Sequence, residues 1–142
     1  MSKTIDPGEA FLLGLLHDIG KLALLLMPKG INSTLERLAA RGCQISAAEL
    51  VLCGFDHGDA GAEVLRHWKF ADELIEAVEH HHEPERSEGP LASLLYLAEF
   101  WTDSDEDLPS NARLNYALKK CNLTAESMNA VKIEMNTAIS NL

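Results

Sequence analysis

One stretch decides the fold of this chain: residues 11–26, which read FLLGLLHDIGKLALLL. The run is apolar except for His17, Asp18 and Lys21 at its centre. Because burying such groups without partners costs free energy, we expect other parts of the chain to supply partners for them. The same groups would also be costly inside a lipid bilayer. We therefore interpret the run as a buried helix and expect no membrane segment.

The composition is typical of a single globular domain. The chain has 142 residues, a hydrophobic fraction of 46% and a net charge of −10. Proteins that bind nucleic-acid backbones need clustered Lys and Arg, so this acidity argues against a nucleic-acid partner. Cys43, Cys53 and Cys121 are widely spaced and include no CxxC pair. This spacing indicates reduced thiols in a cytoplasmic protein and argues against a disulfide framework or a thiolate zinc site.

Helix start and stop signals recur along the chain. Asp6 can cap a helix with Pro7 at its first position, and we expect this helix to run to about Met27. Because it is apolar on all sides, we expect it to be central and covered on most faces. Two further helices are expected to start at the capping boxes that Ser33 and Ser46 open, and the second of them is expected to bend near Asp56 and His57 and resume over 60–68. The remaining helices are expected to span 72–82, 90–101, 111–120 and 125–139, and Thr124 is the expected N-cap of the last one. An acidic loop is expected over 102–110. No alternating strand pattern occurs, so the predicted fold class is all-α, a compact multi-helix domain.

Histidines and acids recur in a pattern across the expected helices. His17 and Asp18 lie in the first helix, and His57 follows the bend. The third group is His80, His81 and His82 at the end of the 72–82 helix, with Glu99 and then Asp103 further on. Helical proteins build metal sites from ligands on different helices, and mixed nitrogen and oxygen ligands suit Mn²⁺, Fe²⁺, Zn²⁺ or Mg²⁺. The alternative is structural: a hydrogen-bonded pair of His17 and Asp18 that locks helix packing, and a His57 that caps carbonyls at the bend.

Four blocks of the sequence carry a family resemblance. They are HDIGK at 17–21, FDHGDAGAEVLRHW at 55–68, IEAVEHHHEP at 75–84 and LASLLYLAE at 91–99. The first matches the HD-x-G-K signature of the HD superfamily of metal-dependent phosphohydrolases, and the other three resemble its HDOD (HD-related output domain) branch. Because four blocks occur in order, the match is far more specific than a lone His-Asp pair. The resemblance implies an HD-type helical domain.

The resemblance also implies a site and two candidate functions. Enzymes of the superfamily use such residues to hold one or two divalent metals that activate water against a phosphoester. The implied metal ligands are His17, Asp18, His57, His81, His82 and, in place of the family's closing aspartate, Glu99. Lys21 would then be the catalytic residue that helps the phosphate or leaving group; its alternative role is to neutralise Asp18 one turn before it. His67 and His80 are expected to lie outside the site.

Members of the HDOD branch are generally viewed as bacterial signalling modules. The first hypothesis is therefore a regulatory module that acts through contacts with signalling proteins or a second copy of itself, with a retained metal site. The alternative is a metal-dependent phosphohydrolase acting on a nucleotide or another phosphoester. No Gly-Tyr-Pro motif follows the double histidine, since residues 83–90 read EPERSEGP, so cyclic-di-GMP hydrolysis is not expected.

The chain also departs from the branch at its beginning. Several helices usually precede the His-Asp helix, and one of them carries a further histidine in many active enzymes. Here only about ten residues come first, so residues 1–142 are interpreted as one domain that resembles the C-terminal portion of the family domain. The first helix would then lack part of its cover, and an exposed apolar patch would favour self-association.

Overall fold

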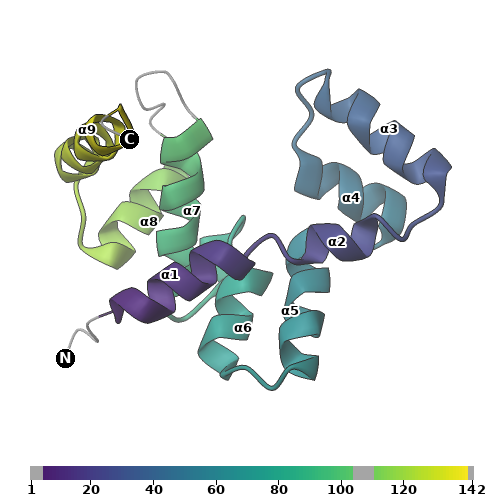
Figure 1. Ribbon diagram of the computed structural model, residues 1–142, viewed down its shortest axis with the longest axis horizontal. Helices are drawn as coiled ribbons and strands as arrows, with labels where there is room; N and C mark the ends of the chain where they lie inside the picture. The colour runs from purple at the N-terminus through teal and green to yellow at the C-terminus, as the bar shows by residue number, and fades with distance from the viewer. Residues whose placement is uncertain (1–4, 104–110, 141–142) are drawn as a thin grey trace.

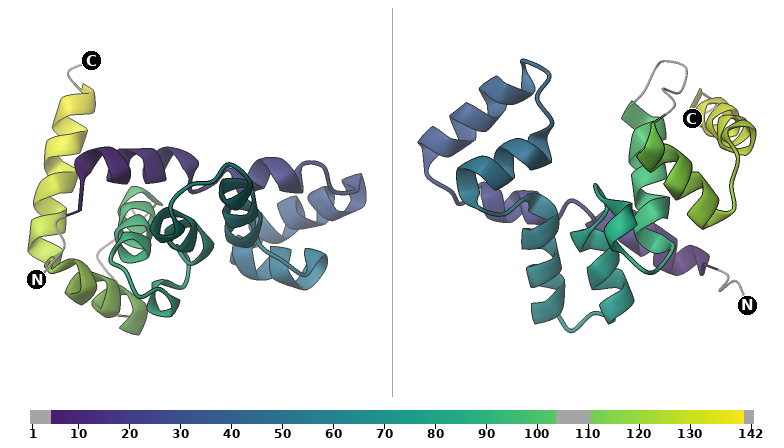
Figure 2. Two further views of the ribbon diagram at one scale, coloured as in Figure 1. Left: turned by 90° about the horizontal axis from the view of Figure 1, so that it is seen from below. Right: turned by 180° about the vertical axis from the view of Figure 1, so that it is seen from behind.

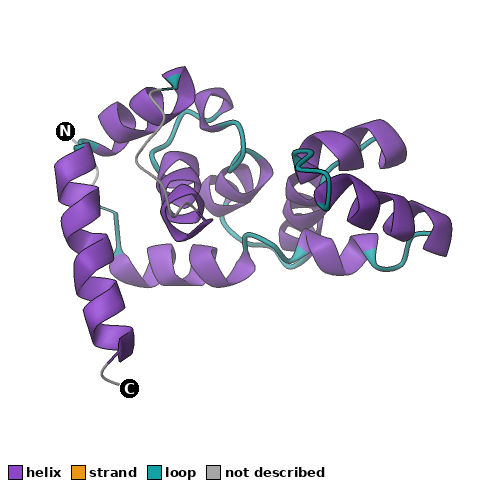
Figure 3. Cartoon of the chain, turned by 90° about the horizontal axis from the view of Figure 1, so that it is seen from above, coloured by secondary structure: helices purple, strands orange, loops and turns teal. Residues whose placement is uncertain are grey.

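All regular structure in the described part of the chain is helical, as the sequence predicts (Figure 1, Figure 3). The computed structural model describes residues 5–103 and 111–140. The helices are α1 (Pro7–Leu16), α2 (Gly20–Leu24), α3 (Lys29–Ala39), α4 (Ile45–Cys53), α5 (His57–His67), α6 (Asp72–Glu79), the short 3₁₀-helix η1 (Pro84–Arg86), α7 (Leu91–Asp103), α8 (Ala112–Cys121) and α9 (Ala125–Ser140). Of these helices, none is both long enough and apolar enough to cross a membrane.

Two neighbouring helices, α5 and α6, form the middle of the molecule (Figure 1). α2 packs on α5, while α1 packs on α6 and α7. The hairpin of α3 and α4 lies at one end, and α8 and α9 lie at the other end beside α7 (Figure 1, Figure 2). The loop between α5 and α6 is short, so the two helices run antiparallel. This arrangement brings the turn after α1, the start of α5 and the end of α6 together.

Apolar packing divides into two clusters that share α7. The larger cluster joins α1, α5, α6 and α7 through Leu13, Ala62, Leu65, Leu74, Ile75, Ala77, Val78, Leu91 and Leu95. The smaller joins α7 and α8 through Leu97, Trp101, Leu114 and Ala117. The indole nitrogen of Trp101 donates a hydrogen bond of 3.2 Å to Asn129 of α9. α7 is therefore the element that connects the two halves of the core.

The first helix differs from the prediction in length and in burial. It is not continuous to Met27: α1 ends at Leu16, a turn covers 17–19, and α2 ends at Leu24. In the turn, the Ile19 N–H donates to the Leu16 carbonyl three residues back, which tightens the backbone relative to an α-helix. The expectation of a central, covered helix is wrong, because α1 and α2 lie at one edge of the molecule (Figure 2). The expected exposed apolar patch is confirmed.

Two predicted helix starts are wrong. α3 begins at Lys29 directly after Pro28, and the hydroxyl of Ser33 donates to the Gly30 carbonyl instead of capping a helix. α4 begins at Ile45, and the side chain of Ser46 makes no cap. In both cases a local capping pattern lies inside a helix that tertiary packing extends backwards.

The other boundaries follow the sequence more closely. Gly54, with φ of +82°, ends α4 in the left-handed region. Asp56 caps α5 in a capping box with Asp59, so α5 begins at His57, three residues before the predicted start at 60. α6 ends at Glu79, three residues earlier than expected. α7, α8 and α9 lie within two residues of their predicted bounds, and Thr124 caps α9 by accepting a hydrogen bond from the Ser127 N–H at 3.2 Å. The predicted acidic loop falls mainly on residues 104–110, outside the described residues.

A direct backbone contact holds α2 against α5. A Cβ atom on Gly20 would lie 1.9 Å from the His57 carbonyl oxygen and 2.5 Å from the Gly61 nitrogen. A methyl group on Gly20 would overlap both atoms, so it could be accommodated only if α2 or α5 moved. Gly20 therefore allows α2 and α5 to approach more closely than any other residue would allow.

We predict that Gly20→Ala destabilises the fold, because its methyl group would overlap the backbone of α5. The expected loss of unfolding free energy is about 3 kcal/mol, the upper range for overpacking. Gly14→Ala is the matched control, since a Cβ there meets no described atom within 4 Å. This control is expected to stabilise α1 by about 0.5–1 kcal/mol. Urea unfolding followed by circular dichroism measures both, and equal effects would contradict the close contact.

Candidate metal centre

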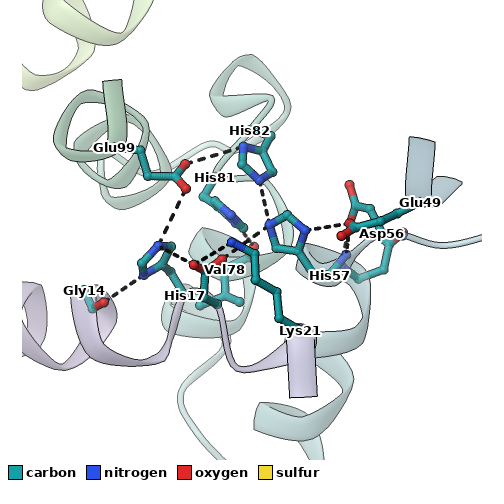
Figure 4. A network of polar contacts seen from close by, with 12 residues as sticks. Gly14, His17, Lys21, Glu49, Asp56, His57, Val78, His81, His82 and Glu99 are labelled. Atoms are coloured by element: carbon teal, nitrogen blue, oxygen red, sulfur yellow. Dashed lines mark hydrogen bonds and ion pairs between the residues drawn. The ribbon is translucent and has the colours of Figure 1, made fainter. Parts of the chain in front are cut away.

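The six residues expected to bind a metal converge at one place (Figure 4). They come from four segments: the turn after α1, the start of α5, the loop after α6 and the middle of α7. They form two clusters, His57 with His81 and His82, and His17 with Asp18 and Glu99. Within each cluster, one candidate ligand atom per residue lies within 4.8 Å of the others.

The turn at 17–19 places two adjacent residues on the same site. Side chains that follow each other in a straight α-helix point about 100° apart. Here His17 Nε2 lies 3.5 Å from Asp18 Oδ2, and Asp18 Oδ1 lies 3.5 Å from His57 Nε2. Asp18 therefore connects the two clusters, and the break in the helix contributes directly to the geometry of the site.

Hydrogen bonds hold three of the four site histidines in the same manner. Each ring donates from Nδ1 to an acceptor outside the site (Figure 4). The pairs are His17 with the Gly14 carbonyl at 2.8 Å, His57 with the Glu49 carboxylate at 2.6 Å, and His81 with the Val78 carbonyl at 2.6 Å. In a neutral ring so arranged, Nε2 carries the lone pair, which is how metal-binding histidines are usually held.

Glu49 is the site residue that the sequence analysis missed. Its side chain on α4 is buried, and Oε2 accepts hydrogen bonds from both the backbone N–H (2.9 Å) and Nδ1 (2.6 Å) of His57. Its spacing from Ser46 predicts a capping box, and this prediction is wrong, because Gln44 occupies the N-cap position of α4. The signal in the sequence was that Glu49 is the one charged residue in the mostly apolar stretch of residues 45–53.

The clearest indication of a metal site is a buried nitrogen of His81 that has no hydrogen-bond partner among the described residues. The ring is fully buried, and Nε2 has no hydrogen-bond partner among the residues described. Burial, with the positive charge of His82, lowers the pKa of His81 to about 4, so the ring is neutral at pH 7. Asp18 Oδ1 is likewise buried and without a hydrogen bond from any described residue. Because an unsatisfied buried polar atom costs about 1–3 kcal/mol, the donor set fits a metal ion that would accept both atoms.

The fourth histidine, His82, contacts residues of both clusters. His82 Nε2 lies 2.7 Å from His57 Nε2, and two lone pairs at this distance would repel each other. Since His57 donates from Nδ1 to Glu49, His82 is the donor in this contact. Burial lowers the pKa of His82, which favours the neutral form of the ring, the form in which histidine binds metals. Its Nδ1 lies 3.5 Å from Glu99 Oε2, and this contact also joins the two clusters.

Both carboxylates of the site are held in the charged form. Burial alone would raise the pKa of Asp18, but a hydrogen bond of 2.8 Å from Lys21 and nearby positive charge lower it below its usual value. Burial likewise opposes ionisation of Glu99, while His17, His82 and His81 lower its pKa. The Glu99 carboxylate, 3.7 Å away, raises the pKa of His17. The pairing of Lys21 with Asp18 is confirmed, and the ammonium group is half-exposed at the edge of the site.

The remaining histidines lie outside the two clusters, as expected. His67 is exposed at the end of α5, and His80 is half-buried at the end of α6. α6 ends at Glu79, and His81 Nδ1 donates to the Val78 carbonyl in the last turn of this helix. Asp103 is the last residue of α7.

Comparison with known proteins agrees with the fold and the motifs. The family model of the HDOD domain matches residues 1–84. The crystal structure of a "Putative phosphohydrolase from Shewanella amazonensis SB2B" is similar to this chain with a TM-score of 0.72 and 24% sequence identity. The match covers 91% of this chain and 51% of the Shewanella chain, so this chain spans about half of that length. No curated protein matches the sequence significantly.

Because the sequence identity to the Shewanella protein is only 24%, the structural similarity shows that the two proteins share a fold and nothing more. The family match is more specific, because it covers more than half of the chain and includes both the His-Asp pair and the double histidine. The chain belongs to the HDOD domain family.

Proposed function

We propose that this chain is a regulatory HDOD domain that binds a divalent metal and acts through contacts with other protein chains. The observation that carries metal binding is the buried Nε2 of His81, a lone pair with no hydrogen-bond partner in the described structure and no proton at pH 7. Rotation of the His81 ring to bring Nε2 to another partner would break the hydrogen bond that Nδ1 donates to the Val78 carbonyl.

The donor set favours some metals over others. Four imidazoles and two carboxylates would hold the ion or ions: His17, Asp18, His57, His81, His82 and Glu99. Imidazole suits Zn²⁺ and Fe²⁺, and a mixed set with carboxylates also suits Mn²⁺, whereas Mg²⁺ prefers oxygen ligands. We therefore propose Mn²⁺, Fe²⁺ or Zn²⁺ as the bound metal.

A second candidate function is phosphoester hydrolysis, which one further observation favours. Lys21 holds a half-exposed ammonium group 2.8 Å from Asp18, where it could contact a phosphate oxygen. A bound divalent ion supplies Lewis-acid chemistry for such a reaction. The regulatory function is preferred because the chain belongs to the output-domain branch, and because Glu99 stands where the resemblance expects an aspartate.

Metal binding is tested by purification without chelators followed by elemental analysis. We expect about one or two equivalents of Mn, Fe or Zn per chain. His81→Ala and His57→Ala are each expected to lower the affinity at least about tenfold, since each removes a ligand. His67→Ala, at an exposed position outside the clusters, is the control and should leave the affinity unchanged. A metal-free protein, or an unchanged affinity in His57→Ala, would refute the proposed site.

Glu49→Gln tests the buried carboxylate that orients His57. The amide keeps the size of the side chain but removes the charge that strengthens the Nδ1 hydrogen bond, so we expect a loss of about 10–100-fold in metal affinity. Glu63→Gln on the exposed surface of α5 is the matched control. Competition with a chromophoric chelator measures both dissociation constants. Equal values for the two variants would mean that Glu49 does not support the metal centre.

The two candidate functions are separated by an assay with bis(p-nitrophenyl) phosphate and added Mn²⁺. The regulatory function predicts stoichiometric metal with no turnover above the background. Turnover that falls about 100-fold in Lys21→Ala, with metal content unchanged, would instead establish the phosphohydrolase. Turnover that is insensitive to Lys21→Ala would leave the hydrolase function without its proposed phosphate contact.

A further inference from the structure

A broad apolar surface on α1, α2 and the turn that follows α2 is exposed in the described structure. It consists of five side chains, here called the α1–α2 stripe: Phe11 (76% exposed), Leu15 (69%), Leu22 (60%), Leu25 (68%) and Leu26 (88%). In views from below and from above, α1 and α2 run roughly end to end along one side of the molecule (Figure 2, Figure 3).

The stripe is distinct from the part of these helices that forms the core. Leu13 and Leu24 are 2% and 5% exposed, and Leu12 and Leu16 pack against the main cluster. The inward faces of α1 and α2 are therefore already satisfied. The outward faces are equally rich in large aliphatic side chains, and a soluble monomer seldom exposes so many together.

The area of the stripe matches one side of a stable protein interface. At roughly 150 Å² for a fully exposed Phe side chain and about 120 Å² for Leu, the five residues present about 450 Å² of apolar surface. A standard interface buries about 800 Å² on each partner, of which a little over half is apolar. The stripe alone thus supplies the apolar area that one half of such an interface requires.

The lack of net charge on the stripe favours a partner surface that is also apolar and uncharged. Within residues 11–26 the charged residues are Asp18 and Lys21, which pair with each other at 2.8 Å. The stripe therefore offers no net charge to attract an acidic or a basic partner, although the whole chain carries −10. Two identical apolar, neutral surfaces related by a two-fold axis satisfy each other, which is the commonest form of self-association.

We propose that a second copy of this chain docks stripe against stripe to form a two-fold dimer. The proposal names a partner for the regulatory module and rests on that proposed function for its biological role. The geometry of the dimer does not require a metal. Dimer formation and metal binding can therefore be tested separately.

The test is the mass of the full chain in solution, measured by light scattering after gel filtration and by sedimentation equilibrium. We expect twice the chain mass of 15.6 kDa at micromolar concentrations. Added salt should strengthen association, because it screens the repulsion between two acidic copies. The double variant Leu15→Glu/Leu26→Glu is expected to give the mass of one chain, with a dissociation constant raised at least 100-fold.

A matched control is available on α9. Ile133 is 67% exposed, similar to Leu15, but lies away from the stripe, so Ile133→Glu should remain dimeric. Circular dichroism checks that all variants keep their helices. A mass of one chain at every concentration, equal dissociation in the control, or growth beyond two copies would each overturn the proposal. A metal-binding monomer would overturn only the dimer, and a metal-free dimer only the metal centre.

Discussion

The contact between the backbones of α2 and α5 is the constraint on which the site depends. Gly20 leaves no room for a side chain between itself and the His57 carbonyl. This approach fixes the preceding turn against the start of α5, and so places Asp18 Oδ1 3.5 Å from His57 Nε2. A separation of the helices by the width of one methyl group would pull the two clusters apart. The packing of these helices and the geometry of the candidate ligands are therefore set by the same contact.

The polar network is better explained by a metal than by structural hydrogen bonding alone. A network that served only to lock helix packing would pair its buried atoms, as nearly all buried polar atoms are paired. Here the outer nitrogens of His57 and His81 are fixed by short hydrogen bonds, while the inward Nε2 of His81 has no hydrogen bond within the described residues. Burial of the Glu49 carboxylate beside His57 also costs desolvation free energy. These costs are concentrated where a cation would offset them.

The sequence predicted the candidate ligands better than it predicted the helices that hold them. The family resemblance named the six residues whose side chains converge in the structure, because a metal site would require particular donor atoms at particular places in the chain. The break at 17–19 was missed, since apolar periodicity cannot register a contact between Gly20 and a segment 37 residues later. Glu49 was missed for a related reason. Its spacing from Ser46 fits a local cap, whereas its partner His57 lies beyond a turn.

The exposed stripe shows what an apolar sequence does and does not specify. A helix that is apolar on all sides must remove its surface from water, but the sequence does not say whether the cover comes from the same chain. In this fold the core covers only the inward side of α1 and α2. The turn that carries His17 and Asp18 separates the two halves of the stripe, so a partner docked there would lie beside the metal centre. If a metal stiffened that turn and thereby changed the affinity for the partner, the partner would change the affinity for the metal by the same factor. A metal site without turnover could then act as a regulatory input.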